Sequence, residues 1–246
     1  MVWTDKQIKQ HKKAAEILIE IKDLVFDYFR KNSNCSEYEV QKFILEKFKE
    51  KNLINERDVP IVAFGKNTSH VHYFPTENCS ALCDECLILI DIWARLNEVD
   101  APYADITWMA YKGKTIPKKF SDVFDFVVGA RDNCVNFIKN NLEKGNFPRC
   151  IDAHKDVCDF FEKKNVLNKF KHGTGHSLGR NDPHGDHPPL NYKSEEELIK
   201  QNLGYTIELG LYFENKFGVR TEINFYINSN DEIIITTPLQ KEIIMI

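Results

Sequence analysis

The stretch TIELGLYFENKFGVRTEINFY, residues 206–226, decides the fold because its pattern is that of two strands joined by a turn. Apolar side chains alternate with polar ones along both strands: Ile207, Leu209, Leu211 and Phe213 on the first, Val219, Thr221, Ile223 and Phe225 on the second. Glu208 and Glu222 therefore face away from the apolar side. If the hairpin is centred on Asn215, the two glutamates lie directly opposite each other, because each is seven residues from that centre.

A second stretch, CLILIDIWARLNEVDAPYADITWMAY at residues 86–111, repeats the arrangement. Asp91 interrupts an apolar strand, Asp105 lies in the next strand, and each is seven residues from Glu98. We therefore expect Asp91 and Asp105 to be cross-strand neighbours as well. Like charges placed directly opposite each other destabilise a sheet, so two such pairs require an explanation.

Metal ions supply that explanation. Two divalent cations roughly 3.5–4 Å apart would be held by carboxylates from both hairpins. His176 is a candidate nitrogen ligand, since it lies in KHGTGHSLGRNDPHGDH, residues 171–187, which holds four of the eight histidines. Such a ligand set suits manganese, iron, cobalt or zinc. The alternative is that the acids are protonated, exposed or paired with a cation such as Arg220.

Composition excludes several other classes of protein. The chain has 246 residues, 42% of them hydrophobic, and a net charge of −4, so no basic surface for nucleic acid is expected. No apolar run approaches the roughly 20 residues of a membrane span, and the N-terminus does not resemble a secretion signal. Seven cysteines at irregular spacing favour a reduced, cytoplasmic protein. Cys79, Cys83 and Cys86 lack a fourth ligand for zinc, and we expect Cys86 to enter the core.

The order of predicted elements is helices, strands, helices, strands. Residues 5–31 and 36–52 have helical periodicity, and Ser36 with Glu39 forms a capping box. Strands follow within residues 59–65, 86–93 and 104–111, helical spacing returns over 120–165, and strands return over 205–213, 218–227 and 232–239. This order predicts an α+β protein that could consist of two similar halves.

Six segments in this order resemble the pita-bread metallopeptidases, the family of methionine aminopeptidase, Xaa-Pro aminopeptidase, prolidase and creatinase. The segments are FGKNTSHVHYFP, LIDIWAR, YADITW, HGTGHSLG, TIELGLYF and GVRTEINF. The resemblance extends from about Val59 to the C-terminus and implies the α+β pita-bread (creatinase/aminopeptidase) fold of two pseudo-symmetric halves. We expect residues 1–246 to form a single catalytic domain that includes the N-terminal helices, 1–57, with no separate N-terminal domain.

The resemblance also implies roles for the acidic residues. The metal ligands of the family carry over to the five residues already singled out: Asp91, Asp105, His176, Glu208 and Glu222. In the family two divalent ions share a hydroxide that attacks the scissile carbonyl, and a ligand glutamate, here Glu208, handles its proton. The metal would be Mn, Co, Fe or Zn.

Histidines of the family position the substrate, and His72 and His184 match two such residues. His187 competes with His184, because the interval from His176 to His184 is eight residues where seven is usual in the family. His172 matches a histidine that Xaa-Pro aminopeptidases and prolidases carry beside the substrate's proline. Arg220 either orients ligand carboxylates or forms a structural salt bridge.

These features together predict a metal-dependent aminopeptidase that cleaves short peptides before proline. The alternatives are a methionine aminopeptidase, a hydrolase of a small amide or amidine, and a non-catalytic binding module. We expect a monomer or homodimer that binds neither nucleic acid nor membrane. Leu209 stands where the family usually has proline, and the interval between Asp91 and Asp105 implies a longer hairpin tip than in most relatives.

Overall fold

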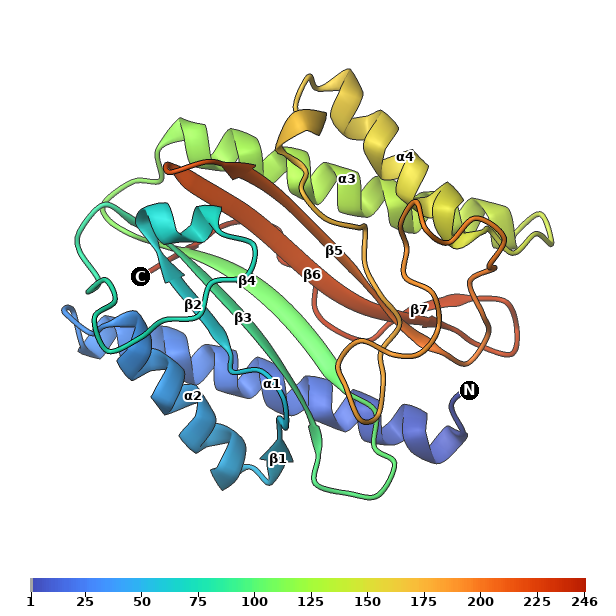
Figure 1. The fold of residues 1–246 in the computed structure, drawn as a ribbon, viewed down its shortest axis with the longest axis horizontal. Coiled ribbons are helices and arrows are strands. Elements are labelled where there is room, and N and C mark those ends of the chain that lie inside the picture. The colour runs from blue at the N-terminus through green and yellow to red at the C-terminus, as the bar shows by residue number, and fades with distance from the viewer. Residues whose placement is uncertain (1) are drawn as a thin grey trace.

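The chain folds into two halves, and each half supplies a pair of helices and a long antiparallel hairpin (Figure 1). The computed structural model describes residues 2–246. The first half contains α1 (Asp5–Lys31), α2 (Glu37–Glu50), β1 (Leu53–Ile54), β2 (Ile61–Phe64), the 3-10 helix η1 (Gly65–Ser69), β3 (Cys86–Leu96) and β4 (Ala104–Lys112). The second contains α3 (Lys118–Leu142), α4 (Cys150–Lys163), η2 (Leu167–Lys169), β5 (Gly204–Phe213), β6 (Phe217–Ile227), β7 (Ile233–Ile235) and β8 (Ile244–Met245).

The α+β class is confirmed, and so are the main predicted elements. Ser36 and Glu39 form the predicted capping box of α2. The helical stretch predicted over 120–165 is two helices, because the connection between them holds Gly145 at φ +76° and Pro148, neither of which continues a helix readily. Cys86 is buried, as expected.

The strands form two sheets. In the first, β1, β3, β4 and β8 follow one another, and β2 pairs with part of β3; in the second the order is β5-β6-β7. All pairs are antiparallel except β4 with β8. Both long hairpins are therefore continuous antiparallel ribbons, as the sequence predicted.

The register confirms one predicted carboxylate pair and corrects the other. Glu208 lies directly opposite Glu222, and Asn215 at the hairpin tip adopts the left-handed conformation, φ +56°, that asparagine tolerates. Asp91, however, lies opposite Thr107, and Asp105 lies opposite Trp93.

The β3–β4 hairpin is centred on Val99 rather than Glu98, because its tip turns at Glu98–Ala101, where Asp100 has φ +57°. The prediction that Asp91 and Asp105 are directly opposed was therefore wrong by two residues. A register shift of two residues leaves each side chain on the same face of its strand, so both aspartates still lie on one side of the ribbon.

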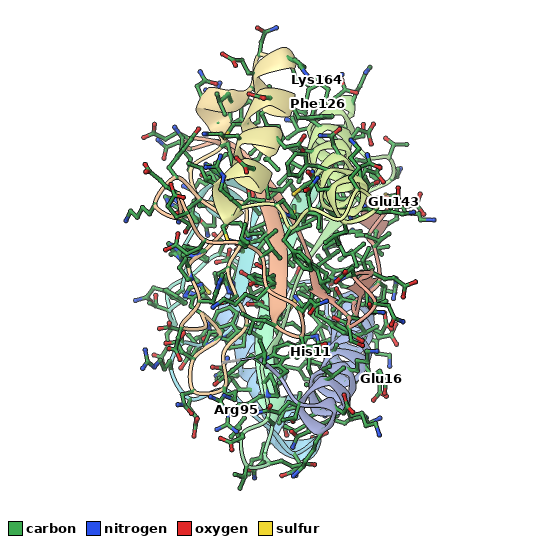
Figure 2. The ribbon with its side chains drawn as sticks, turned by 90° about the vertical axis from the view of Figure 1, so that its right-hand side faces the viewer. His11, Glu16, Arg95, Phe126, Glu143 and Lys164 are labelled. Atoms are coloured by element: carbon green, nitrogen blue, oxygen red, sulfur yellow. The ribbon has the colours of Figure 1, made fainter. Side chains whose placement is uncertain are left out.

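Helices cover each ribbon on its apolar face. Leu18, Ile21 and Val25 of α1 pack in one core cluster with Ile88, Ile90 and Ile92 of β3. Val127 and Ile138 of α3 pack in a second cluster with Ile207, Leu209 and Leu211 of β5. In Figure 1 the strands accordingly lie between the α1–α2 pair and the α3–α4 pair. Figure 2 shows Phe126 of α3 close to Lys164, which follows α4 and places its ammonium 5.8 Å from the ring centre. No helix among the described residues is long and apolar enough to cross a membrane.

Buried polar side chains join the halves, among them Asn224 and His11. Asn224 of β6 accepts a hydrogen bond from the Asp105 amide at 2.9 Å and donates one to the Asp105 carbonyl at 2.7 Å. His11 of α1, labelled in Figure 2, bonds the Tyr103 carbonyl at 2.8 Å and the Thr236 hydroxyl at 2.7 Å. Burial lowers the pKa of His11 to about 4, so the ring is neutral at physiological pH.

We expect Asn224→Ala to destabilise the protein by about 2–4 kcal/mol, because it leaves a buried amide and a buried carbonyl of Asp105 without partners. Urea unfolding followed by circular dichroism measures the change. Asn136→Ala on the exposed face of α3 is the matched control and should be near neutral. Equal stability of the two variants would contradict the role given to Asn224.

Candidate active site

Four carboxylates converge where the two ribbons meet. Asp91 of β3, Asp105 of β4, Glu208 of β5 and Glu222 of β6 line one cavity of about 120 Å³, together with His176 and Arg220. Ligand atoms of Asp105, His176 and Glu222 lie within 4.8 Å of one another, the spacing of groups around a metal ion. The structure thus brings together all five residues that the family resemblance implied as ligands.

Three carboxylate oxygens in this cavity are buried without a hydrogen-bond partner among the described residues: Asp91 Oδ1, Asp105 Oδ1 and Glu222 Oε1. Burial raises the pKa of Asp91 to about 6, although Arg220 opposes the rise. Burial and mutual repulsion raise the pKa values of Asp105 and Glu222 well above their usual range. Negative charge in this cavity is therefore costly unless a cation is bound, and the donor set fits a divalent metal.

Arg220 crosses between the two ribbons. Its guanidinium donates to Asp91 Oδ2 at 2.7 Å, to Glu208 Oε1 at 3.3 Å and to the Val71 carbonyl at 3.1 Å. Burial opposes charge on Glu208, but the adjacent His172 and the Arg220 guanidinium outweigh it, so the pKa of Glu208 is lowered to about 2. Arg220 therefore forms a buried salt bridge and also fixes the orientation of two of the four carboxylates.

The segment that contains His176 pairs with β5 in the manner of an additional strand. The Thr206 and Glu208 amides of β5 donate to the carbonyls of His176 and Thr174, both at 2.8 Å. A Cβ on Gly175 would meet the Thr206 carbonyl oxygen at 2.1 Å, so only glycine permits this approach. The segment consequently fixes the imidazole beside the carboxylates.

The protonation of the His176 ring follows from its hydrogen bond. Nδ1 lies 3.0 Å from the Ser177 carbonyl, which can only accept, so Nδ1 carries the proton. Nε2 then presents its lone pair toward Asp105, whose Oδ2 is 3.8 Å away. Burial lowers the pKa of His176 to about 4, which keeps this nitrogen free to bind a metal.

The two competing histidines occupy different positions. The His184 ring packs at right angles to the His176 ring, with centres 4.2 Å apart, and it lines the carboxylate cavity. His187 is buried against Tyr205, its Nδ1 3.2 Å from the hydroxyl, and lines only an adjoining cavity of about 310 Å³. This placement favours His184 over His187 as a substrate contact.

His72 and His172 border the same adjoining cavity. His72 is exposed and also lines the carboxylate cavity. His172 bonds the Gly173 carbonyl at 2.8 Å through Nδ1 and the Tyr212 hydroxyl at 2.9 Å through Nε2. Burial lowers the pKa of His172, and the neighbouring Glu208 carboxylate opposes that shift.

The sequence analysis missed three residues of the site. Tyr212 lies four residues after Glu208 on β5. Because alternate residues of a strand share a face, this spacing could have placed its hydroxyl on the face of Glu208. Thr107, opposite Asp91, donates to Glu222 Oε2 at 3.1 Å. Asp58 lines the carboxylate cavity from the connection between β1 and β2, where the sequence has no periodic signal.

Comparison with known proteins agrees with the resemblance. A model of metallopeptidase family M24 matches residues 9–229. The chain is 30% identical over 234 residues to an uncharacterized peptidase of Methanocaldococcus jannaschii, covering 94% of this chain and 62% of that protein. It is 27% identical over 239 residues to an Xaa-Pro aminopeptidase of Haemophilus influenzae, covering 85% of this chain and 52% of that one. The chain thus spans less than two thirds of the length of these curated relatives.

The fold is also that of solved structures. The X-Pro aminopeptidase from Thermotoga maritima superposes with a TM-score of 0.87 at 22% identity, over 100% of this chain and 65% of that chain. The architecture is therefore the α+β pita-bread fold that the sequence predicted. With its residues 9–229 matched by the family model and this fold in common, the chain belongs to metallopeptidase family M24.

Proposed function

We propose that the chain is a dinuclear metal-dependent aminopeptidase that releases the N-terminal residue of a short peptide, with preference for a bond that precedes proline. The observation that carries the proposal is the set of three buried, unpartnered carboxylate oxygens beside the free Nε2 of His176. Arg220 pairs with the other oxygen of Asp91, but within residues 2–246 no arginine or lysine forms an ion pair with Asp105 or Glu222, whereas divalent cations would neutralise both.

The ligands in this proposal are Asp91, Asp105, His176, Glu208 and Glu222, and the metal is Mn, Co, Fe or Zn. Divalent ions held by these residues would lower the pKa of bound water and polarise the scissile carbonyl. Glu208 is ionised at neutral pH, because its pKa is lowered to about 2. It is therefore able to accept a hydrogen bond from a nearby water, and the role of proton acceptor is assigned to it by the family resemblance rather than by this pKa.

Histidines would orient the substrate. His72 and His184 line the carboxylate cavity from opposite halves of the chain, and each can donate to a substrate carbonyl or to the oxyanion that develops from it. His172 is held by Tyr212 next to the same space. Their convergence on one cavity wall supports a role in positioning the peptide bond rather than in binding metal.

The preference for proline rests on the HGTGH segment and on relatives described as Xaa-Pro aminopeptidases. An Xaa-Pro bond lacks an amide hydrogen, so its recognition requires donors from the protein to the substrate carbonyl. His72 and His184 can provide such donors, whereas both ring nitrogens of His172 are engaged by the Gly173 carbonyl and the Tyr212 hydroxyl, so His172 would contact the substrate by packing. A methionine aminopeptidase remains the second candidate, because it would use the same carboxylates.

We expect Asp105→Ala to lower hydrolysis of Ala-Pro-Ala by at least about 100-fold and to lower the bound metal measured by elemental analysis. Asp125→Ala, which removes an exposed carboxylate of α3, is the matched control and should leave both unchanged. A folded, metal-loaded wild type without activity on any peptide would reject the proposal.

A peptide panel separates the two aminopeptidase activities. We expect kcat/KM for Ala-Pro-Ala to exceed that for Met-Ala-Ala by at least about 10-fold, because a contact that fits only one substrate discriminates by about 1–3 kcal/mol. Initial rates with Mn²⁺, Co²⁺ and Zn²⁺ measure the ratio. A ratio below one would favour the methionine-specific alternative.

Chelation should lower the melting temperature, and more so at higher pH. The raised pKa values of Asp91, Asp105 and Glu222 mean that the metal-free folded state retains protons that the unfolded chain releases. The contribution of these groups to the free energy of unfolding is fully present below their usual pKa near 3.8–4.5. It is lost as pH rises through about 6 and beyond.

In EDTA, the melting temperature should therefore fall between about pH 5 and 8, by several degrees, since 1 kcal/mol moves it by about 2–4 °C in a chain of this size. Excess Mn²⁺ should largely cancel the fall. Asp105→Asn should reduce the pH dependence of the metal-free protein. An unchanged melting temperature after confirmed metal removal would contradict this account.

A further inference from the structure

A third cavity, of about 420 Å³, lies on the far side of His172 from the carboxylates. Its lining shares His172, Gly173 and Asn191 with the histidine-lined cavity of about 310 Å³. That cavity in turn shares His72, His176, His184 and Glu208 with the carboxylate cavity. The three cavities thus form a row that begins at the carboxylates and continues past His172 to the third one, which we call the lysine pocket.

Aromatic rings form much of the lysine pocket. The Tyr192 ring packs edge-on against His154 of α4, with centres 4.3 Å apart, and Phe170 lies 5.8 Å from His154 and 5.2 Å from His172. His154 Nδ1 lies 2.9 Å from the Thr174 hydroxyl. Burial lowers the pKa of His154 to about 4, so the floor of the pocket is neutral and suits apolar or aromatic groups.

Lys171 and Lys193 supply the charge of this pocket, and no carboxylate lines it. Both side chains are exposed, and within residues 2–246 neither ammonium has a hydrogen bond or an ion pair. Three acidic groups act on residues of the lining but lie outside it: Asp159 and Glu162 of α4 act on Cys158 and Tyr192, and Glu208 acts on His172. The pocket therefore offers two unpaired cations above an aromatic wall.

The opposite end of the row offers an acidic group. Arg220 and the proposed metal ions would offset the charge of the four carboxylates, but Asp58 also lines that cavity and has no ion pair among the described residues. A short peptide carries an ammonium at one end and a carboxylate at the other. Its two charges would match the two ends of this row of cavities.

From this arrangement we infer that the lysine pocket binds the carboxyl-terminal end of the peptide substrate, with its free α-carboxylate between Lys171 and Lys193. The inference rests on the proposed aminopeptidase function. An aminopeptidase must bind the residue that it releases on one side of the scissile bond and the rest of the peptide on the other side. The small carboxylate cavity accommodates the released residue, and the larger cavities beyond the histidines accommodate the rest of the peptide.

The substrate class is therefore narrower than peptides in general. Free peptides of three or more residues reach the lysine pocket, and an apolar or aromatic side chain near the carboxyl end packs on Phe170 and Tyr192. A dipeptide ends too close to the metal centre to use both features. A peptide whose carboxyl end is blocked, or continues as a protein chain, loses the contact with the two lysines.

The test compares Ala-Pro-Phe with its carboxyl-terminal amide, Ala-Pro-Phe-NH₂, on the metal-loaded protein. We expect kcat/KM for the free acid to exceed that for the amide by about 3- to 10-fold, mainly through KM, and the ratio to shrink with added salt. Lys171→Met combined with Lys193→Met should bring the ratio close to one by slowing the acid alone. Lys144→Met combined with Lys155→Met removes the same charge from exposed sites outside the pocket and should leave the ratio unchanged.

Calorimetric binding of the product Pro-Phe and of Pro-Phe-NH₂ gives a readout that does not depend on turnover, and the acid should bind more tightly. If an active wild type had the same kcat/KM for the acid and the amide, this inference would be overturned and the proposed function would stand. If the Lys171/Lys193 variant lowered kcat/KM equally for the acid and the amide, that result would also overturn it. Absence of hydrolysis of every peptide by the metal-loaded protein would instead reject the proposed function.

Discussion

The structure depends on the burial of four carboxylates at the junction of two β-ribbons. Burying ionised groups is costly unless they are paired, and the single guanidinium of Arg220 reaches only Asp91 and Glu208. Asp105 and Glu222 retain unpartnered oxygens. The rest of the fold compensates for this cost: two apolar clusters hold the ribbons, and Asn224 ties the backbone of Asp105 to β6.

The two ribbons are similar in construction but differ in register, and the difference has a structural consequence. Glu208 and Glu222 are directly opposed, whereas Asp91 and Asp105 are offset by two residues. The offset places Thr107 opposite Asp91, and its hydroxyl bonds Glu222. Thr107 of the first ribbon thus donates to an acid of the second, and Arg220 of the second pairs with Asp91 of the first as well as with Glu208 of its own. Each ribbon therefore supplies a donor to an acid of the other.

Strand alternation and turn propensity predicted much of this site. What they missed depends on contacts between segments that are distant in the sequence. Alternation along the strands placed all four acids on the correct faces, and a turn residue suited to positive φ, Asn215, set the register of β5 with β6. The tip of the β3–β4 hairpin could not be predicted in the same way, because its turn position depends on contacts of the loop as a whole. The expected metal site brings the two hairpins together but gives no register of β4 against β6, so the bonds of Asn224 to Asp105 emerged only in three dimensions. The lysine pocket is unpredictable for the same reason, since Lys171 and Lys193 belong to irregular segments on either side of it.

A site that is unfavourable without its cation also constrains how the surrounding segments are held. His176 must meet the carboxylates with one nitrogen exposed, and it does so because its segment is bonded to β5 and its other nitrogen is bonded to Ser177. Gly175 allows that bonding because the Thr206 carbonyl leaves no room for a side chain. Thr174, one residue earlier, bonds both the Glu208 amide and the ring of His154 in the lysine pocket. A single short segment therefore contacts both ends of the row of cavities: it carries the imidazole, and Thr174 bonds Glu208 on one side and the floor of the lysine pocket on the other.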